Sequence, residues 1–302
     1  MNPNTKPSLS WSESIWFFDV DDTLINTAEL TEVSSQSMVP VLEKSIGKEK
    51  AGQLREHFLQ IFATMLAGHR LHHPAEWEKQ PELKKEYNAL VQKMESYQQH
   101  IQEEFGGIKK WSREIFVQLA ADQIGIDLAP TVIDLAADAY WTTLAEKATL
   151  LEGVLELFQE ILAHDRPVFL VTGSDAHLQR NDDGQFRYSP KYSEEFKLKR
   201  IHPLREKGVH FHGVSIGDPV DKPHREFFEK ALKMAARELG KTIDPKNVIM
   251  VGDSFASDLQ VPKEELGFGL VVLFEKGRTK IETIDERQVI TGNLAGLTQF
   301  FY

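Results

Sequence analysis

The feature that most constrains the fold is a set of three short apolar runs, each ending in acidic, hydroxyl or glycine residues. The runs are Ile15–Val20, Pro167–Gly173 and Asn247–Asp253. Runs of this length and composition are typical of strands buried on both faces of a parallel sheet. Two further runs, Phe211–Asp218 and Leu266–Phe274, are predicted to join them. Helical spacing between the runs predicts a doubly wound, Rossmann-like α/β sheet.

The segment 28–147 differs because it contains no strand-like run. Apolar residues at helical spacing predict one helix around Leu54–Met65 and another over Leu83–Ile101. Ser112 is expected to cap a third helix, and Pro130 to occupy the first turn of a fourth. We therefore predict an α/β core made of 1–27 and 148–302, interrupted by an all-helical cap over 28–147.

Composition excludes several classes of partner. The 302-residue chain is 41% hydrophobic and 27% charged, as expected for a globular protein, and its net charge is -11. This charge argues against nucleic acid or an anionic membrane as the main partner, although a small anion could bind a local positive site. The chain has no cysteine, so disulfides and thiolate catalysis are excluded. No signal peptide or membrane span is recognised, and a cytoplasmic location is expected.

The first apolar run ends in three carboxylates, Asp19, Asp21 and Asp22. Ligands of open α/β sheets bind at the carboxyl ends of the strands. Because side chains alternate along a strand, Asp19 and Asp21 are expected to point the same way. Neighbouring carboxylates repel, and a hard cation such as Mg²⁺ would offset the repulsion.

The other runs end in residues that suit a metal and a phosphate. Asp253 closes the third long run and Asp258 follows five residues later. The second run ends in "VTGSD", where Thr172 offers a hydroxyl, and Gly173 and Ser174 offer backbone N–H groups to an anion. Before the third run, Lys222 is followed by a proline that fixes the start of a helix. These residues are expected at one rim of the sheet.

The segments "DVDDTL", "VTG", "DKPHREFF" and "GDSFASD", in this order, resemble the four signature motifs of the haloacid dehalogenase superfamily. The motifs span Asp19 to Asp258, so the resemblance covers the whole predicted core. The helical insertion after the first strand resembles the helical cap found between the first and second motifs of that superfamily.

The resemblance implies a role for each motif residue. Asp19 would be the nucleophile that forms an aspartyl-phosphate, and Asp21 the general acid and base. Crowding and partial burial are expected to raise the pKa of Asp21. The phosphoryl group would be held by Thr172, Gly173, Ser174 and Lys222. Mg²⁺, or Mn²⁺ in its place, would be held by Asp19, the backbone carbonyl of Asp21 and Asp253, and Asp258 would complete the metal site from behind these ligands or through a water.

Three stretches depart from the pattern or invite another interpretation. Pro262 follows Asp258 closely and is expected to break or shift the helix there, which weakens the assignment of Asp258. The stretch Leu178–Ser193 is an unusually long link between the second and third motifs and is interpreted as a surface loop or hairpin that could reach the site. The loop Gly68–Pro74 is interpreted as an exposed cap loop rather than a metal site, and its basic side chains could face an anionic substrate. These side chains are His69, Arg70, His72 and His73.

We therefore predict a Mg²⁺-dependent phosphomonoester hydrolase that acts on a small phosphorylated metabolite. A phosphoprotein (phosphotyrosine) phosphatase and a phosphomutase remain alternatives on the same fold. Dehalogenation is disfavoured, because relatives with that activity lack an aspartate at the position of Asp21. A catalytically silent binding module is the alternative from another class, and the combined presence of Asp19, Asp21, Lys222 and Asp253 argues against it.

Overall fold

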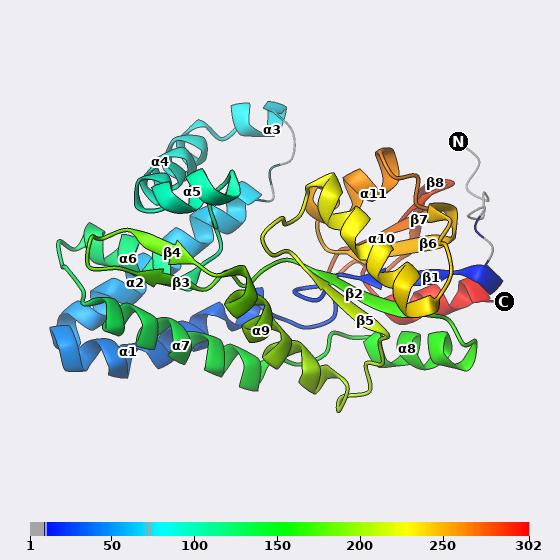
Figure 1. Cartoon of the computed structure of the whole chain (residues 1–302), viewed down its shortest axis with the longest axis horizontal. Coiled ribbons are helices and arrows are strands. Elements are labelled where there is room, and N and C mark those ends of the chain that lie inside the picture. Colours follow the sequence, from blue (N-terminus) through cyan, green and yellow to red (C-terminus); the bar gives the residue numbers. More distant parts are fainter. Residues whose placement is uncertain (1–8, 10, 70, 72–73, 302) are drawn as a thin grey trace. The chain divides into compact units, whose positions relative to one another are not determined.

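The computed structural model describes residues 9, 11–69, 71 and 74–301 (Figure 1). The chain divides into two compact units. Unit 1 contains the described residues up to Asn26, then Thr149–Ser174, and the chain from Lys197 onward. Unit 2 contains Thr27–Ala148 and Asp175–Phe196.

A seven-stranded sheet forms the centre of unit 1, with the strand order β5-β2-β1-β6-β7-β9-β8 (Figure 1). The strands are β1 (Ile15–Phe18), β2 (Val168–Thr172), β5 (Gly213–Ile216), β6 (Val248–Gly252), β7 (Leu270–Phe274), β8 (Glu282–Asp285) and β9 (Gln288–Thr291). All neighbours pair in parallel except β8, which runs antiparallel to β9. The predicted α/β class is confirmed, and each of the five predicted strands is present. The edge strand β8 and its neighbour β9 were not predicted.

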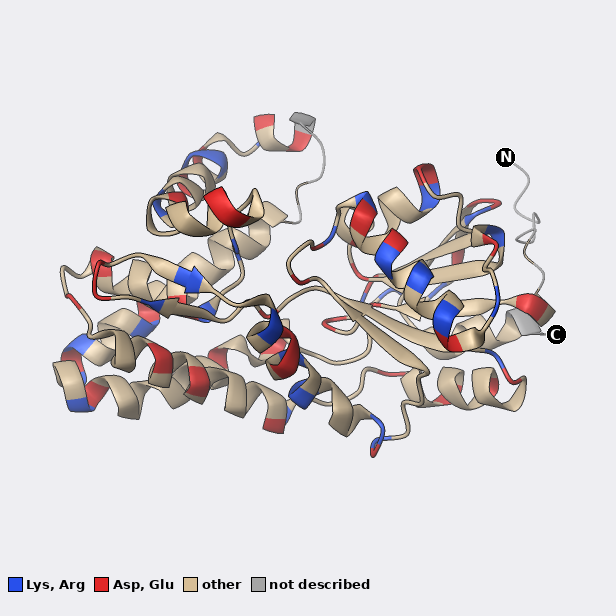
Figure 2. Cartoon of the chain, in the orientation of Figure 1, with Lys and Arg blue, Asp and Glu red and all other residues tan. Residues whose placement is uncertain are grey.

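Each face of the sheet is covered by a helix with one apolar side. On one face, Ile15 and Phe17 pack in a buried cluster with Phe227 and Phe228 of α10 (Arg225–Leu239). On the other face, the Phe18 ring lies 4.9 Å from the ring of Phe158 in α8 (Val154–Ala163). Figure 2 shows that α10 also carries Lys, Arg and Glu residues along its length. Strand β1 is therefore apolar on both faces, and its polar residues begin only beyond its carboxyl end.

Unit 2 is built from helices around its own apolar cluster. These helices are α1 (Thr31–Ile46), α2 (Lys48–His69), α3 (Pro74–Glu78), α4 (Pro81–Tyr97), α5 (Gln99–Phe105), α6 (Arg113–Gln123) and α7 (Pro130–Lys147). The hydroxyl of Ser112 accepts a hydrogen bond from the Ile115 N–H, so the predicted cap of α6 is confirmed. Pro130 opens α7 as predicted. Helix α1, which contains Pro40, was not predicted.

The link between the second and third motifs contributes to both units. It forms a hairpin of β3 (Leu178–Arg180) and β4 (Phe186–Tyr188), followed by α9 (Pro190–Ile201). Leu178 and Phe186 are buried in the apolar cluster of unit 2, so the hairpin is an integral part of that unit. The predicted core, 148–302, includes this stretch, and α9 is not among the predicted helices. The division between the units falls inside α9, and Lys197 and Arg200 belong to unit 1.

Two further expectations concern unit 2 and the membrane. Of the predicted Gly68–Pro74 loop, Gly68 and His69 belong to the end of α2, and the His69 ring packs 5.4 Å from Trp111. Arg70, His72 and His73 lie outside the described residues. Among the helices that the structure describes, none has both the length and the apolarity needed to cross a bilayer.

Candidate active site

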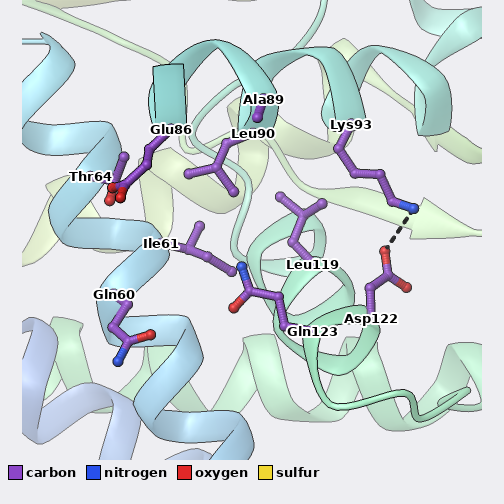
Figure 3. A pocket seen from close by; sticks show the side chains of 10 residues that line it. All are labelled: Gln60, Ile61, Thr64, Glu86, Ala89, Leu90, Lys93, Leu119, Asp122 and Gln123. Carbon is purple, nitrogen blue, oxygen red and sulfur yellow. Dashed lines mark ion pairs between the residues drawn. The ribbon is translucent and has the colours of Figure 1, made fainter. Parts of the chain in front are cut away.

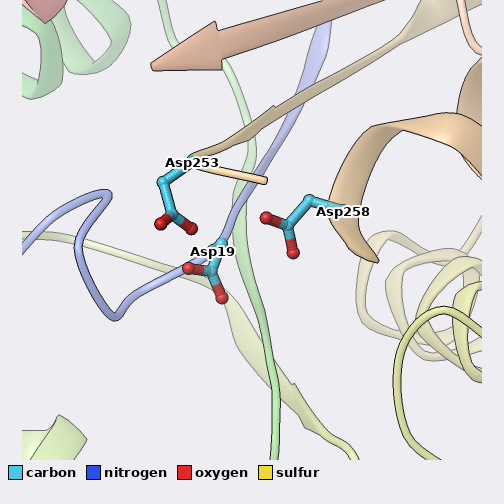
Figure 4. Close-up of side chains that lie close together, drawn as sticks. All are labelled: Asp19, Asp253 and Asp258. Atoms are coloured by element: carbon cyan, nitrogen blue, oxygen red, sulfur yellow. The ribbon is translucent and has the colours of Figure 1, made fainter. Parts of the chain in front are cut away.

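Three carboxylates meet at the carboxyl ends of β1 and β6. Phe18 pairs with Val251 in the parallel register, and the Asp19 N–H donates to the Val251 carbonyl at 2.9 Å. Asp19 and Asp253 thus leave two neighbouring strands at the same edge. With Asp258 they form a group in which one carboxylate oxygen of each lies within 4.8 Å of the others (Figure 4).

Asp258 is held in this group by the backbone that follows β6. It lies in a single π-helical turn, Phe255–Leu259, and its Oδ2 accepts a hydrogen bond from the Ser254 N–H at 3.0 Å. A Cβ on Gly252 would come within 2.5 Å of the Asp258 side chain, so this position requires glycine. The helix that follows, α11 (Gln260–Glu264), includes Pro262. The expected disturbance therefore takes the form of a wide turn that leaves Asp258 facing Asp19.

Lys222 supplies a positive charge to the group. Its Nζ lies 2.6 Å from Oδ1 of Asp19 and 2.7 Å from Oδ1 of Asp258, and all three side chains are buried. Burial by itself would lower the pKa of Lys222, but the charges of Asp19 and Asp258 outweigh it and raise that pKa. Lys222 is therefore a fixed cation between two acids.

Burial and mutual repulsion make ionisation of the three carboxyl groups costly when Lys222 is the only cation that offsets their negative charge. Burial raises the pKa of Asp19 to about 7, with Lys222 acting against this and Asp258 adding to it. The pKa of Asp253 is raised well above its usual range by desolvation and by the charges of Asp258 and Asp19. Asp253 is exposed to solvent, so the charges of Asp258 and Asp19 are the main reason for this rise.

The donor set suits a hard divalent cation. Carboxylate oxygens are the ligands that Mg²⁺ prefers, and three such groups so close together need more positive charge than one lysine provides. The residues therefore fit Mg²⁺.

Asp21 is placed differently from the prediction. Its carboxylate is bound by two cations of α9: Lys197 Nζ lies 2.6 Å from Oδ2, and the Arg200 guanidinium donates to Oδ1 at 2.7 Å and to Oδ2 at 2.9 Å. The group formed by Asp19, Asp253 and Asp258 does not include it. Desolvation alone would raise the pKa of Asp21, but Arg200 and Lys197 outweigh it and hold that pKa far below its usual range. The expected rise in this pKa was therefore wrong, because sequence analysis did not foresee the two cations.

A sequence model of the haloacid dehalogenase-like hydrolases matches residues 15–264. The chain belongs to this family. No curated protein sequence gives a significant match.

Solved structures of haloacid dehalogenase-like proteins share the fold at low sequence identity. A HAD-hydrolase of Bacillus subtilis described as bound to magnesium, YfnB, has a TM-score of 0.52 at 13% identity, covering 95% of this chain and 97% of its own. A 2-haloacid dehalogenase of Pseudomonas syringae gives 0.51 at 15%, with 95% and 97% covered. A protein of Thermotoga maritima described as a β-phosphoglucomutase gives 0.54 at 11%, with 95% and 98% covered. The fold is therefore shared by proteins named for different reactions, and only the residues of the site can decide between them.

The second motif of this haloacid dehalogenase-like chain is held by acids that sequence analysis did not single out. The Ser174 N–H donates to Asp221 at 3.0 Å, and its hydroxyl donates to Asp218 at 2.6 Å. Asp221 also accepts from the Lys222 N–H at 2.7 Å, so it joins the second and third motifs. Ser174, predicted to bind phosphate, is thus engaged by carboxylates in this structure. The buried Thr172 hydroxyl, in contrast, has no hydrogen-bond partner among the described residues.

A cavity of about 540 Å³ lies within unit 2, between α2, α4 and α6 (Figure 3). Its lining includes Ile61, Leu90 and Leu119, and also Lys93 and Asp122, whose charged groups form an ion pair 3.5 Å apart. None of the motif residues lines it. The cavity therefore does not contribute to the acid cluster.

Proposed function

We propose that this haloacid dehalogenase-like hydrolase is a Mg²⁺-dependent phosphatase that cleaves phosphomonoesters through an aspartyl-phosphate on Asp19. The observation that carries the proposal is the convergence of Asp19, Asp253 and Asp258 with Lys222 at the strand ends. An acid nucleophile, further carboxylates for a cation and a buried lysine are what transfer of a phosphoryl dianion requires. Asp21 favours this chemistry over dehalogenation.

In the first step, an oxygen of the Asp19 carboxylate attacks phosphorus. The bond between phosphorus and the ester oxygen breaks, and the departing alkoxide takes a proton from Asp21. In the second step, a water oxygen attacks phosphorus and gives its proton to Asp21. The bond between Asp19 and phosphorus then breaks, which restores the carboxylate and releases inorganic phosphate.

The remaining residues would position the phosphoryl group and neutralise its charge. Asp19, Asp253 and Asp258 would hold Mg²⁺, together with the backbone carbonyl of Asp21. When bound, Mg²⁺ neutralises the phosphoryl charge and keeps Asp19 ionised. Lys222 would orient Asp19 and bind a phosphoryl oxygen, and the Thr172 hydroxyl and the Gly173 N–H would bind others.

The contacts of Asp21 bear on the order of events. The ionised form that Lys197 and Arg200 stabilise suits the second step, in which Asp21 accepts a proton from water. The first step needs a protonated Asp21, which these contacts oppose. We propose that catalysis includes a rearrangement around Asp21, and that the helical unit 2, which occupies the sequence position of the predicted cap, selects a small phosphorylated metabolite.

The test is hydrolysis of p-nitrophenyl phosphate by the full chain, with Mg²⁺ and with EDTA, for the wild type and for Asp19→Asn. We expect turnover only with Mg²⁺, and its reduction by roughly three orders of magnitude or more in Asp19→Asn. The matched control is Asp182→Asn, an exposed aspartate of the hairpin, which should retain wild-type turnover. Acid-quenched protein should carry phosphate on Asp19 by mass spectrometry. Equal turnover by the wild type and Asp19→Asn would contradict the proposal.

A further inference from the structure

The two cations that bind Asp21 form a preformed binding site for a carboxylate. Lys197 and Arg200 are three residues apart on α9 and therefore lie on one face of the helix. Their side chains are 1% and 4% exposed, so both charged groups are desolvated. Burying two cations beside each other is costly unless an anion lies between them. The geometry is thus specific for an anion at this position.

The shape of the site matches a carboxylate. The Arg200 guanidinium contacts both oxygens of Asp21, a two-pronged arrangement that arginine adopts with planar anions. Lys197 adds a third contact to one of the same oxygens. Neutralising the acid cluster does not explain these cations, because they contact Asp21, which is not a member of the cluster of Asp19, Asp253 and Asp258.

The occupant, in contrast, is accessible. The Asp21 side chain is 31% exposed, whereas the cations are buried. Because Asp21 is the solvent-exposed partner, a carboxylate from solution could take its place against Lys197 and Arg200 while both cations stay buried. Asp21 also stands two residues from the proposed nucleophile Asp19, and in the proposed reaction it protonates the leaving group. A group bound to the cations would therefore belong to the leaving group of the substrate.

We propose that Lys197 and Arg200 select phosphomonoesters whose leaving group carries a carboxylate, an inference that rests on the proposed function. The substrate carboxylate replaces that of Asp21 on the two cations. The exchange moves the Asp21 side chain off the two cations. Substrate recognition and release of Asp21 are then one event.

The test compares two esters that differ only in this group, 3-phosphoglycerate and glycerol 3-phosphate. With Mg²⁺ present, we expect the wild type to prefer 3-phosphoglycerate in kcat/KM by about tenfold or more, since a hydrogen-bonded charge pair typically contributes that much. Lys197→Met and Arg200→Met should reduce the preference to about twofold or less. Lys197→Arg and Arg200→Lys keep the charge and should retain part of it. Lys199→Met, an exposed position on the same helix, should leave the preference unchanged.

The ratio between the two esters separates recognition from a merely structural role, because a disturbed fold lowers both rates alike. A wild-type ratio near one, or a ratio that survives both methionine variants, would overturn the inference. A second measurement is the ratio of the dissociation constants of the two esters, determined by calorimetry on Asp19→Asn with Mg²⁺. If the wild type hydrolyses neither ester nor p-nitrophenyl phosphate, the proposed function fails, and the binding ratio still decides the present inference.

Discussion

The ammonium of Lys222 lies 2.6 Å from Oδ1 of Asp19, and both side chains are buried. The same ammonium contacts Asp258 at 2.7 Å. Lys222→Met would leave two buried carboxylates without their shared cation. We expect the free energy of unfolding of the Mg²⁺-free protein to fall by about 3–5 kcal/mol, as measured by urea denaturation at pH 7.5.

The control for this substitution is Lys233→Met, an exposed position on α10. Its free energy of unfolding should stay within about 0.5 kcal/mol of the wild type. Equal stability of Lys222→Met and Lys233→Met would mean that the acids are not ionised around Lys222.

Mg²⁺ should stabilise the folded chain, because the three carboxylates converge only after folding. At a concentration one hundred times its Kd, a ligand specific for the folded state contributes about 2.7 kcal/mol. We expect Mg²⁺ to raise the melting temperature of the wild type and to have little effect on Asp253→Asn. Differential scanning fluorimetry over a Mg²⁺ series measures both, with Asp182→Asn as the control. A wild-type melting curve that does not respond to saturating Mg²⁺ would count against the metal site.

Gly252 should be intolerant of a side chain, because its added Cβ would come within 2.5 Å of Asp258. Gly252→Ala is expected to displace Asp258, to weaken the stabilisation by Mg²⁺ and to lower the free energy of unfolding by about 1–3 kcal/mol. Gly52→Ala is the matched control: a Cβ there meets nothing within 4 Å, and the residue lies inside helix α2. It should stabilise the chain by up to about 1 kcal/mol. A Gly252→Ala protein that responds to Mg²⁺ like the wild type would show that the turn can adapt.

Unit 2 contains a buried ion pair that should make its stability depend on pH. His177 Nδ1 lies 2.9 Å from Oε1 of Glu114. Desolvation would lower the pKa of His177, but the hydrogen bond and charge of Glu114 outweigh it, so this pKa is raised. A group whose pKa is higher in the folded state adds to the free energy of unfolding while it is protonated. For His177 this contribution is complete below its unfolded pKa of 6.5 and is lost as the pH rises through its folded pKa.

The other ionisable groups around His177 act in the same direction. The charges of Asp175 and Asp138 add to the rise in the pKa of His177, and the pKa values of Asp134, Asp138 and Tyr192 are themselves raised, mainly by burial. Burial, with the charges of Glu114 and Asp138, raises the pKa of Asp134 to about 6, so its contribution is lost between about pH 4 and 6. Urea denaturation followed by tryptophan fluorescence should show stability falling from pH 6 to pH 9. His177→Gln should flatten the part above pH 6.5, whereas His100→Gln, at a half-exposed position, should not. An identical slope in His177→Gln would contradict this assignment.

The sequence predicted those elements whose signal is local. Strand β1 is apolar on both faces and ends where its acids begin, and α6 begins after the hydroxyl of Ser112. Such patterns depend on residues a few positions apart. Strand β8 was missed because all four of its residues are exposed, and an exposed edge strand has no apolar pattern that distinguishes it from a loop.

The residues of the candidate site likewise fall into those that the sequence could predict and those that it could not. The order of the motifs along the chain was sufficient to predict that Asp19, Lys222, Asp253 and Asp258 would meet, because parallel strands bring their carboxyl ends to one edge. The environment of Asp21 was not predictable, since Lys197 and Arg200 lie 176 and 179 residues away in the sequence. No local pattern marks a lysine and an arginine three residues apart as partners of a distant acid.

The sequence by itself therefore determined the α/β fold class and the acids at the strand ends, because the first follows from periodicity and the second from where strands end. Only the tertiary structure decided the charge state of Asp21. A pKa depends on which charges lie within a few ångströms and on how much water reaches them, and both are fixed by the packing of segments far apart in the chain.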